Sequence, residues 1–117
     1  MIYFKFDARF DFVESETLRT LADLADVWMA VFPAISFYIT SGTDSATAHA
    51  AAAVAGDFHV QGKAFDFRTH QIPHDQMPKL EHLFRDFMTS HPGWQLLLEN
   101  PGKPIEHGHA EHDGLLH

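Results

Sequence analysis

Two short segments of the chain, residues 57–68 (DFHVQGKAFDFR) and 105–113 (IEHGHAEHD), hold the side chains best suited to chemistry. Their candidate ligands and acids are His59, Asp66, Glu106, His107 and His109. Imidazole nitrogens, a carboxylate and a spare acid are the components of a catalytic zinc site that keeps one open coordination position. The two segments together therefore indicate metal-assisted hydrolysis.

The residues between the two candidate ligands His59 and Asp66 make the pattern of the first segment more specific. Asp66 follows His59 by seven residues, a spacing that is uninformative alone in a chain with ten histidines. Gly62 can take a positive φ at a turn or let the backbone pass close to a site. Ala64 leaves room on the strand face that carries Asp66. The full pattern is therefore more specific than the histidine–aspartate spacing.

The sequence resembles the zinc peptidases of D-alanyl-D-alanine carboxypeptidase type, which include phage endolysins and have the hedgehog signalling domain as a relative. The resemblance rests on HVQGKAFD at residues 59–66 and EHGH at residues 106–109, and covers roughly residues 35–113. Two positions depart from the family pattern. Asp57 stands where the family usually has serine, and no arginine follows the Ser-Gly pair at residues 41–42.

The resemblance implies a role for each candidate residue. His59, Asp66 and His109 would hold Zn²⁺, with a water molecule in the fourth position. Zinc lowers the pKa of such a water to near 7 and polarises a scissile carbonyl. Glu106 would act as the general base. His107 would donate a hydrogen bond to the oxyanion or position the base.

The role of Glu106 depends on where the last strand begins. Glu106 precedes His109 by three residues, so on a straight strand the two side chains would point to opposite faces. The assignment therefore requires regular strand to start at His107, and Pro104 favours such a late start. If the strand begins earlier, Glu99 or His107 takes the base role.

Two further charged residues allow more than one interpretation. Arg68 shares a strand face with Asp66 and could bind a substrate carboxylate, or form a salt bridge that orients an acid. Asp57 could accept a hydrogen bond from a ligand imidazole or cap a turn.

Composition limits the partners and the compartment. The formal net charge of −8 disfavours nucleic acid and anionic membranes as partners. There is no cysteine, so any zinc site must use histidine and carboxylate ligands. We find no signal peptide and no stretch of transmembrane length, and we expect synthesis in the cytoplasm. Action on a cell wall would then need release or delivery, for example by lysis or a phage particle.

The hydrophobic pattern predicts one α+β domain over residues 1–117, with a small, mainly antiparallel sheet and helices on one face. Strands are expected at residues 2–6, 35–40, 64–69, 94–98 and 105–111, and helices at 15–32, 46–55 and 75–90. In the third strand, Phe65 and Phe67 should be buried while Asp66 faces the opposite side. In the first helix, Leu18 is expected on the buried stripe and Met29 in the core.

Three functions are compatible with the sequence. The leading hypothesis is a zinc peptidase that hydrolyses an amide bond in peptidoglycan peptides, as a D,D-carboxypeptidase or an endopeptidase. The second is a non-catalytic zinc-binding module, such as a phage structural or binding domain. The third is a histidine-rich, pH-responsive protein without a metal. The oligomeric state does not follow from the sequence.

Overall fold

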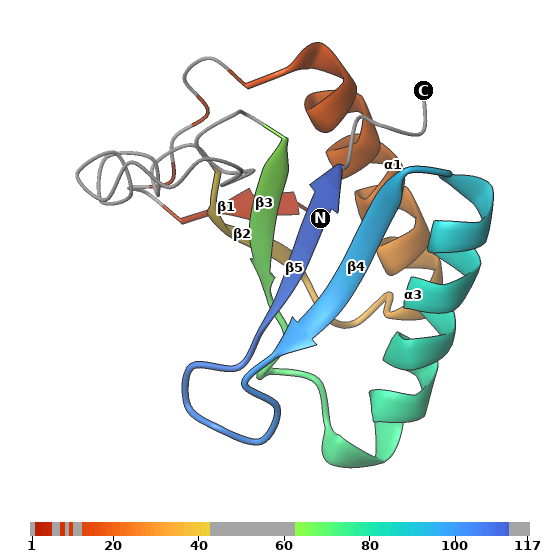
Figure 1. Cartoon of the computed structure of the whole chain (residues 1–117). Coiled ribbons are helices and arrows are strands. Elements are labelled where there is room, and N and C mark those ends of the chain that lie inside the picture. Colours follow the sequence, from red (N-terminus) through yellow and green to blue (C-terminus); the bar gives the residue numbers. More distant parts are fainter. Residues whose placement is uncertain (1, 6–7, 9, 11–12, 43–62, 113–117) are drawn as a thin grey trace.

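Five strands form one sheet in the order β1-β2-β3-β5-β4 in the computed structural model (Figure 1). The structure describes residues 2–5, 8, 10, 13–42 and 63–112. In sequence order the elements are β1 (Ile2–Phe4), α1 (Ser15–Val31), β2 (Phe37–Ser41), β3 (Ala64–Arg68), the 3-10 turn η1 (His74–Gln76), α3 (Met77–Ser90), β4 (Trp94–Glu99) and β5 (His107–His112). Strand β1 is parallel to β2 and the other pairings are antiparallel. The predicted α+β class with a mainly antiparallel sheet is confirmed.

Helices α1 and α3 cover one face of the sheet, and the core lies between these layers (Figure 1). Alternation along β3 turns Phe65 and Phe67 toward the helices, where both are fully buried, and leaves Asp66 partly exposed on the other side. Trp28 of α1 contacts the ring of Phe67 edge-on, with 6.0 Å between the ring centroids. The predicted division of this strand into an aromatic face and a polar face is thus confirmed.

Helix α1 presents a slightly different stripe to the sheet from the one predicted. Leu18 is 45% exposed and Met29 is 41% exposed, so the expectation that both are buried is wrong. The helix is rotated so that Thr17 and Leu24 face the core in their place. Apolar periodicity alone does not fix this rotation, because it does not show that polar Thr17 and Thr20 become buried against the core.

The apolar spacing in α3 predicts a buried stripe of Leu80, Leu83, Phe84, Phe87 and Met88; the first four are buried and Met88 is half-buried. Asp75, the first residue of the helix expected at residues 75–90, lies inside η1 instead, and α3 begins after Gln76 with no side-chain cap. The helix predicted at residues 46–55 lies outside the described residues. Among the described residues, neither helix is long and apolar enough to cross a membrane.

Gly108 of β5 is required by the core behind it. It pairs with Phe67 across the β3–β5 ladder, and the Phe67 ring lies over its Cα. A Cβ built at residue 108 would lie 2.2 Å from Cε2 of Phe67, closer than real contacts allow. The glycine between the two histidines of β5 therefore lets the aromatic layer pack against this strand.

Candidate metal centre

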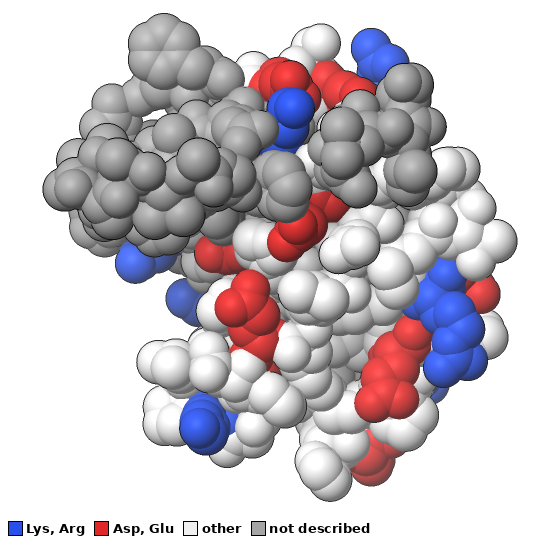
Figure 2. Space-filling view, viewed as in Figure 1, with Lys and Arg blue, Asp and Glu red and all other residues white. Residues whose placement is uncertain are grey.

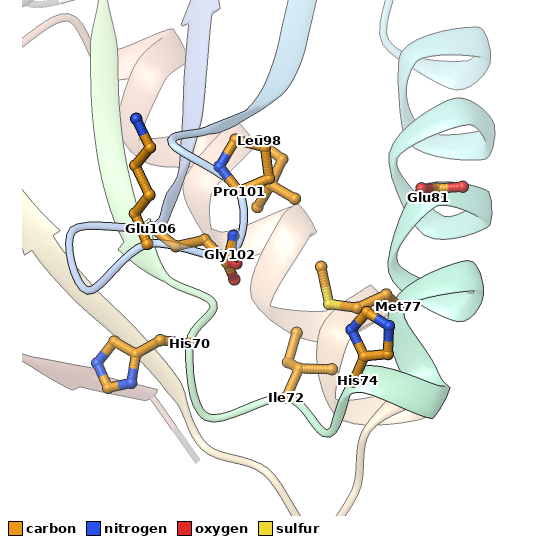
Figure 3. A pocket seen from close by; sticks show the side chains of 10 residues that line it. His70, Ile72, His74, Met77, Glu81, Leu98, Pro101, Gly102 and Glu106 are labelled. Atoms are coloured by element: carbon orange, nitrogen blue, oxygen red, sulfur yellow. Dashed lines mark hydrogen bonds between the residues drawn. The ribbon is translucent and has the colours of Figure 1, made fainter.

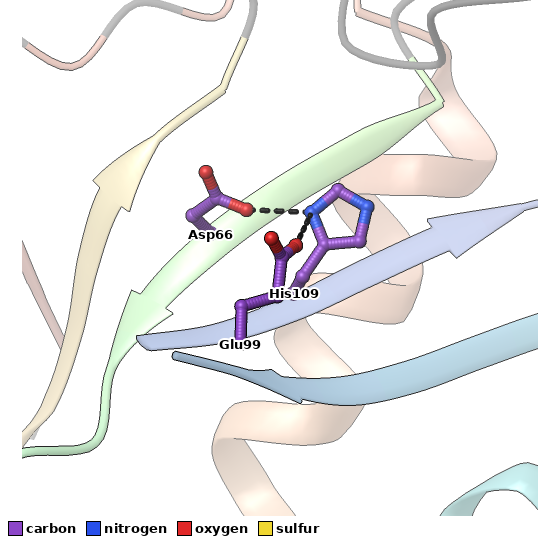
Figure 4. Close-up of side chains that lie close together, drawn as sticks. All are labelled: Asp66, Glu99 and His109. Carbon is purple, nitrogen blue, oxygen red and sulfur yellow. Dashed lines mark hydrogen bonds and ion pairs between the residues drawn. The ribbon is translucent and has the colours of Figure 1, made fainter. Parts of the chain in front are cut away.

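The pairing of β3, β5 and β4 brings three potential metal ligands onto one face of the sheet. This face, opposite the one that α1 and α3 cover, is called the open face below. Asp66 pairs directly with His109 across the β3–β5 ladder, and Glu99 of β4 pairs with His107. Opposed residues of antiparallel strands project to the same face, as do residues two apart on one strand. Asp66, Glu99 and His109 therefore converge from three neighbouring strands (Figure 4).

The distances between these three side chains suit a shared ion. Asp66 Oδ1 lies 2.7 Å from His109 Nδ1, and Glu99 Oε1 lies 3.5 Å from the same nitrogen. One ligand atom from each residue can be chosen so that all three lie within 4.8 Å of one another. A tetrahedral zinc ion with bonds of about 2.0–2.1 Å separates its ligand atoms by roughly 3.4 Å. Small side-chain adjustments would bring the three atoms to these separations.

The chemistry of the donors also suits zinc. One imidazole with two carboxylates is a mixed nitrogen and oxygen set, whereas Mg²⁺ and Ca²⁺ favour oxygen ligands alone. The His109 side chain is 11% exposed and that of Asp66 17%, while Glu99 is 41% exposed. The centre is therefore sheltered on one side and open to solvent on the other. Open access of this kind is needed if the site also takes a substrate.

His107 lies beside the three donors with its ring orientation fixed. Its Nδ1 lies 2.9 Å from the carbonyl oxygen of Ile105, which can only accept, so Nδ1 is the donor. The other nitrogen, Nε2, lies 3.8 Å from Glu99 Oε1 and 4.0 Å from Asp66 Oδ1. In the neutral ring Nε2 presents its lone pair to the two carboxylates, an arrangement that a cation between them would stabilise.

Glu106 lies in the loop before β5, because the strand starts at His107 as its proposed role requires. Both carboxylate oxygens accept hydrogen bonds: Oε1 from the Thr69 hydroxyl at 3.0 Å and Oε2 from the backbone N–H of Gly102 at 2.8 Å. The carboxylate therefore ties residues 100–106 to the end of β3. It is oriented by these bonds.

A cavity of about 400 Å³ adjoins the donors and includes Glu106 in its wall. Its lining residues are Lys5, Thr40, Asp66, Arg68, His70, Pro104, Ile105, Glu106 and His107. A second cavity of about 420 Å³ shares His70 and Glu106 with the first. Figure 3 shows this second cavity, with Ile72, Met77, Leu98 and Pro101 contributing apolar side chains. The two cavities together provide room for a ligand that extends past the donor cluster.

Arg68 stands in the wall of the first cavity, on the same sheet face as Asp66. Its guanidinium carbon lies 4.1 Å from the centroid of the Tyr38 ring, a cation–π contact. Among the described residues, no carboxylate forms an ion pair with Arg68. The salt bridge that sequence reasoning offered as an alternative is thus not formed within the described part of the chain, and the guanidinium is held by an aromatic ring.

The candidate residues from the sequence fall into three groups. Asp66 and His109 are in direct contact, with His107 beside them. Glu106 and Arg68 line the adjoining cavity. His59 and Asp57 lie outside the described residues, so the structure is silent on the third predicted ligand.

Glu99 is the residue that sequence reasoning did not include among the ligands. It closes β4 and was considered only as a substitute base. Its position follows from the strand order: β4 pairs with β5, so Glu99 is brought opposite His107. A lone acid at a strand end gives no local signal of this kind, and only the long-range pairing identifies it.

Charge on the open face has an uneven distribution (Figure 2). Acidic side chains lie over the strands and also on the side of α3 in this view, whereas most visible lysine and arginine side chains lie toward the edges. A concentration of carboxylates around two imidazoles favours a bound cation.

Comparison with protein-family models, with curated proteins and with solved structures gives no match.

Proposed function

We propose that the chain is a zinc-dependent peptidase that hydrolyses an amide bond in peptidoglycan peptides. The metal part of this proposal is supported by the convergence of Asp66, Glu99 and His109 beside a cavity. The peptide substrate and the hedgehog-like peptidase fold rest on the sequence resemblance. In this proposal Asp66 and His109 hold the zinc ion, and His59 is the third ligand expected from the sequence.

The bound zinc would supply Lewis acidity and a low-pKa water. The chain's own residues provide the remaining functions. Glu106 is the proposed base, because it faces the cavity that contains Asp66 and His107 and its carboxylate is already oriented. His107 would position the base or the reacting group. Arg68 is placed to bind a substrate carboxylate in the same cavity.

Metal analysis is the first test. Purified protein should contain about one zinc per chain, and Asp66→Ala should lose it. Unchanged zinc content in Asp66→Ala would refute the ligand assignment. A wild-type chain that binds no zinc even when the ion is added would refute the metal site as a whole.

Hydrolysis is the second test, and two acids serve as matched variants. Wild-type protein is incubated with purified muropeptides and the products are weighed by mass spectrometry. Glu106→Gln should retain zinc and abolish cleavage. Glu99→Gln, which removes one charge from the donor cluster, should bind zinc more weakly and keep measurable cleavage when the ion is in excess. If instead Glu99→Gln retains zinc and abolishes cleavage while Glu106→Gln is active, Glu99 is the base.

One observation favours a second function, a non-catalytic zinc-binding module. Both oxygens of Glu106 are engaged by Thr69 and Gly102, so the carboxylate already has a structural role in holding the loop. Under this alternative the wild-type protein binds zinc but cleaves no muropeptide. The metal and hydrolysis measurements together therefore separate the two functions.

A further inference from the structure

The imidazole of His109 is contacted by carboxylates at both of its nitrogens. Nδ1 lies 2.7 Å from Asp66 Oδ1, and Nε2 lies 3.0 Å from Glu111 Oε1. A neutral imidazole has one N–H donor, and an ionised carboxylate only accepts. One nitrogen of a neutral His109 therefore donates to its carboxylate, while the other presents a lone pair on the side where a cation would bind.

The surroundings of the two nitrogens differ, and the difference identifies which side is the metal side. Nδ1 faces two carboxylates, because Glu99 Oε1 lies 3.5 Å away in addition to Asp66. Nε2 is contacted by Glu111. Two carboxylates around one lone pair can share an ion, whereas a single carboxylate opposite an N–H accepts a hydrogen bond.

We propose that Glu111 is a positioning residue for the metal centre: it accepts a hydrogen bond from His109 Nε2–H and thereby directs Nδ1 to the metal. This inference rests on the metal site proposed above and adds a residue to it. Metal-bound histidines commonly donate their second N–H to a carboxylate, which fixes the tautomer and the ring orientation. Glu111 is suited to this role by direct contact with the ring.

The sheet holds Glu111 in place for this hydrogen bond. Glu111 follows His109 by two residues on β5, so both side chains project to the same face. Its side chain is 21% exposed, which shields the hydrogen bond in part from water. Across the β3–β5 ladder, Glu111 is opposed by Ala64, whose short side chain leaves space for the carboxylate to turn toward the imidazole.

Zinc affinity of the full chain tests the proposal, measured by competition with a chromophoric chelator. Glu111→Ala should bind zinc about 10–100-fold more weakly, the usual loss when a carboxylate behind a ligand histidine is removed. Glu111→Gln should recover part of the affinity, because the amide oxygen still accepts a hydrogen bond. Glu14→Ala, which removes an exposed acid at the start of α1, is the matched control and should bind as wild type does.

Two spectroscopic measurements report on the ring itself. The visible spectrum of bound Co²⁺ should change in Glu111→Ala and stay close to wild type in Glu111→Gln. In the zinc-loaded wild-type protein, the ¹⁵N shifts of His109 should show Nε2 protonated and Nδ1 bound to the metal. These readouts depend on ring orientation rather than on the general stability of the strand.

Several outcomes would overturn the inference. Wild-type affinity with an unchanged cobalt spectrum in Glu111→Ala removes the role of Glu111, and so does a zinc-loaded protein with His109 protonated at Nδ1. The metal site would survive both results, provided that Asp66→Ala still loses zinc. If the wild-type chain binds neither Zn²⁺ nor Co²⁺, the proposed site and this inference fail together.

Discussion

The two faces of the sheet are built from the same strands but serve opposite purposes. The face under the helices contains fully buried aromatic rings such as Phe37, Phe65 and Phe67. The open face carries Asp66, Glu99, His107 and His109, whose side chains retain some contact with water. Because side chains alternate along a strand, a residue that stabilises the fold adjoins one that is available for chemistry. Substitutions of neighbouring residues should therefore have very different effects.

The largest difference is expected between Leu96 and Leu97 of β4. Leu96 is 3% exposed on the helix-covered face, and Leu97 is 45% exposed on the open face opposite His109. Leu96→Ala should lower the free energy of unfolding by about 2–5 kcal/mol, because it leaves a cavity in the core. Leu97→Ala should change it by less than about 0.5 kcal/mol, as is usual for an exposed position.

Urea unfolding followed by circular dichroism measures both leucine variants under identical conditions. Similar losses of stability in the two would mean that the open face is packed against another part of the chain. In that case the contrast between the two faces would not hold.

The next largest effect concerns metal affinity rather than stability. Asp66→Asn keeps the shape of the side chain but replaces a charged donor with a neutral amide. We expect zinc affinity to fall on the order of 100-fold, equivalent to about 2.7 kcal/mol. The unfolding midpoint without metal should fall less than it does in Leu96→Ala. Isothermal titration calorimetry gives the affinity, and an unchanged value would argue against Asp66 as a ligand.

Gly108→Ala tests whether the close contact between β5 and the Phe67 ring limits the stability of the protein. The added methyl group meets the ring of Phe67, so either the ring or β5 must move. Overpacking of this kind costs about 1–3 kcal/mol. Reducing the ring in Gly108→Ala/Phe67→Leu should recover part of the loss, a coupling that a double-mutant cycle would measure. Additive effects of the two substitutions would show that the contact is not the cause.

The smallest effect is expected at a histidine–aspartate pair remote from the sheet face. His82 Nε2 lies 3.1 Å from Asp86 Oδ2 on α3, and their side chains are 70% and 66% exposed. Asp86→Ala should alter stability by less than about 0.5 kcal/mol, because solvent and salt screen an exposed pair. Zinc affinity should not change. A loss of affinity in this variant would mean that zinc also binds at α3.

Local sequence patterns predicted much of the fold, because they reflect local physics. Alternation in β3 separated Phe65 and Phe67 from Asp66 correctly. The last strand, expected from residue 105, begins at His107, which is the later start that Pro104 favours. The same local patterns could not fix the rotation of α1, which turned Leu18 outward. That rotation depends on how well the helix fits the sheet, which is a property of the whole core.

The candidate site was predictable in part for the same reason. The motif residues Asp66 and His109 meet as expected, since each lies on a recognisable strand. The sequence offered Glu99 only as a substitute base and gave Glu111 no role, because their positions depend on which strands become neighbours and in which register. Strand order is decided by contacts between distant parts of the chain, and a single sequence does not reveal them.

The position of β5 has a consequence for how the protein matures. This strand follows the other four in the sequence, yet it lies inside the sheet with β3 and β4 bonded to its two edges. A nascent chain that has emerged only as far as residue 106 therefore lacks His107 and His109. It also leaves exposed the edges of β3 and β4 that would pair with β5. The donor cluster of Asp66, Glu99 and His109 is therefore complete only when β5 has joined the sheet. A chain that ends before β5 lacks His109 and is prone to associate through the exposed edges of β3 and β4.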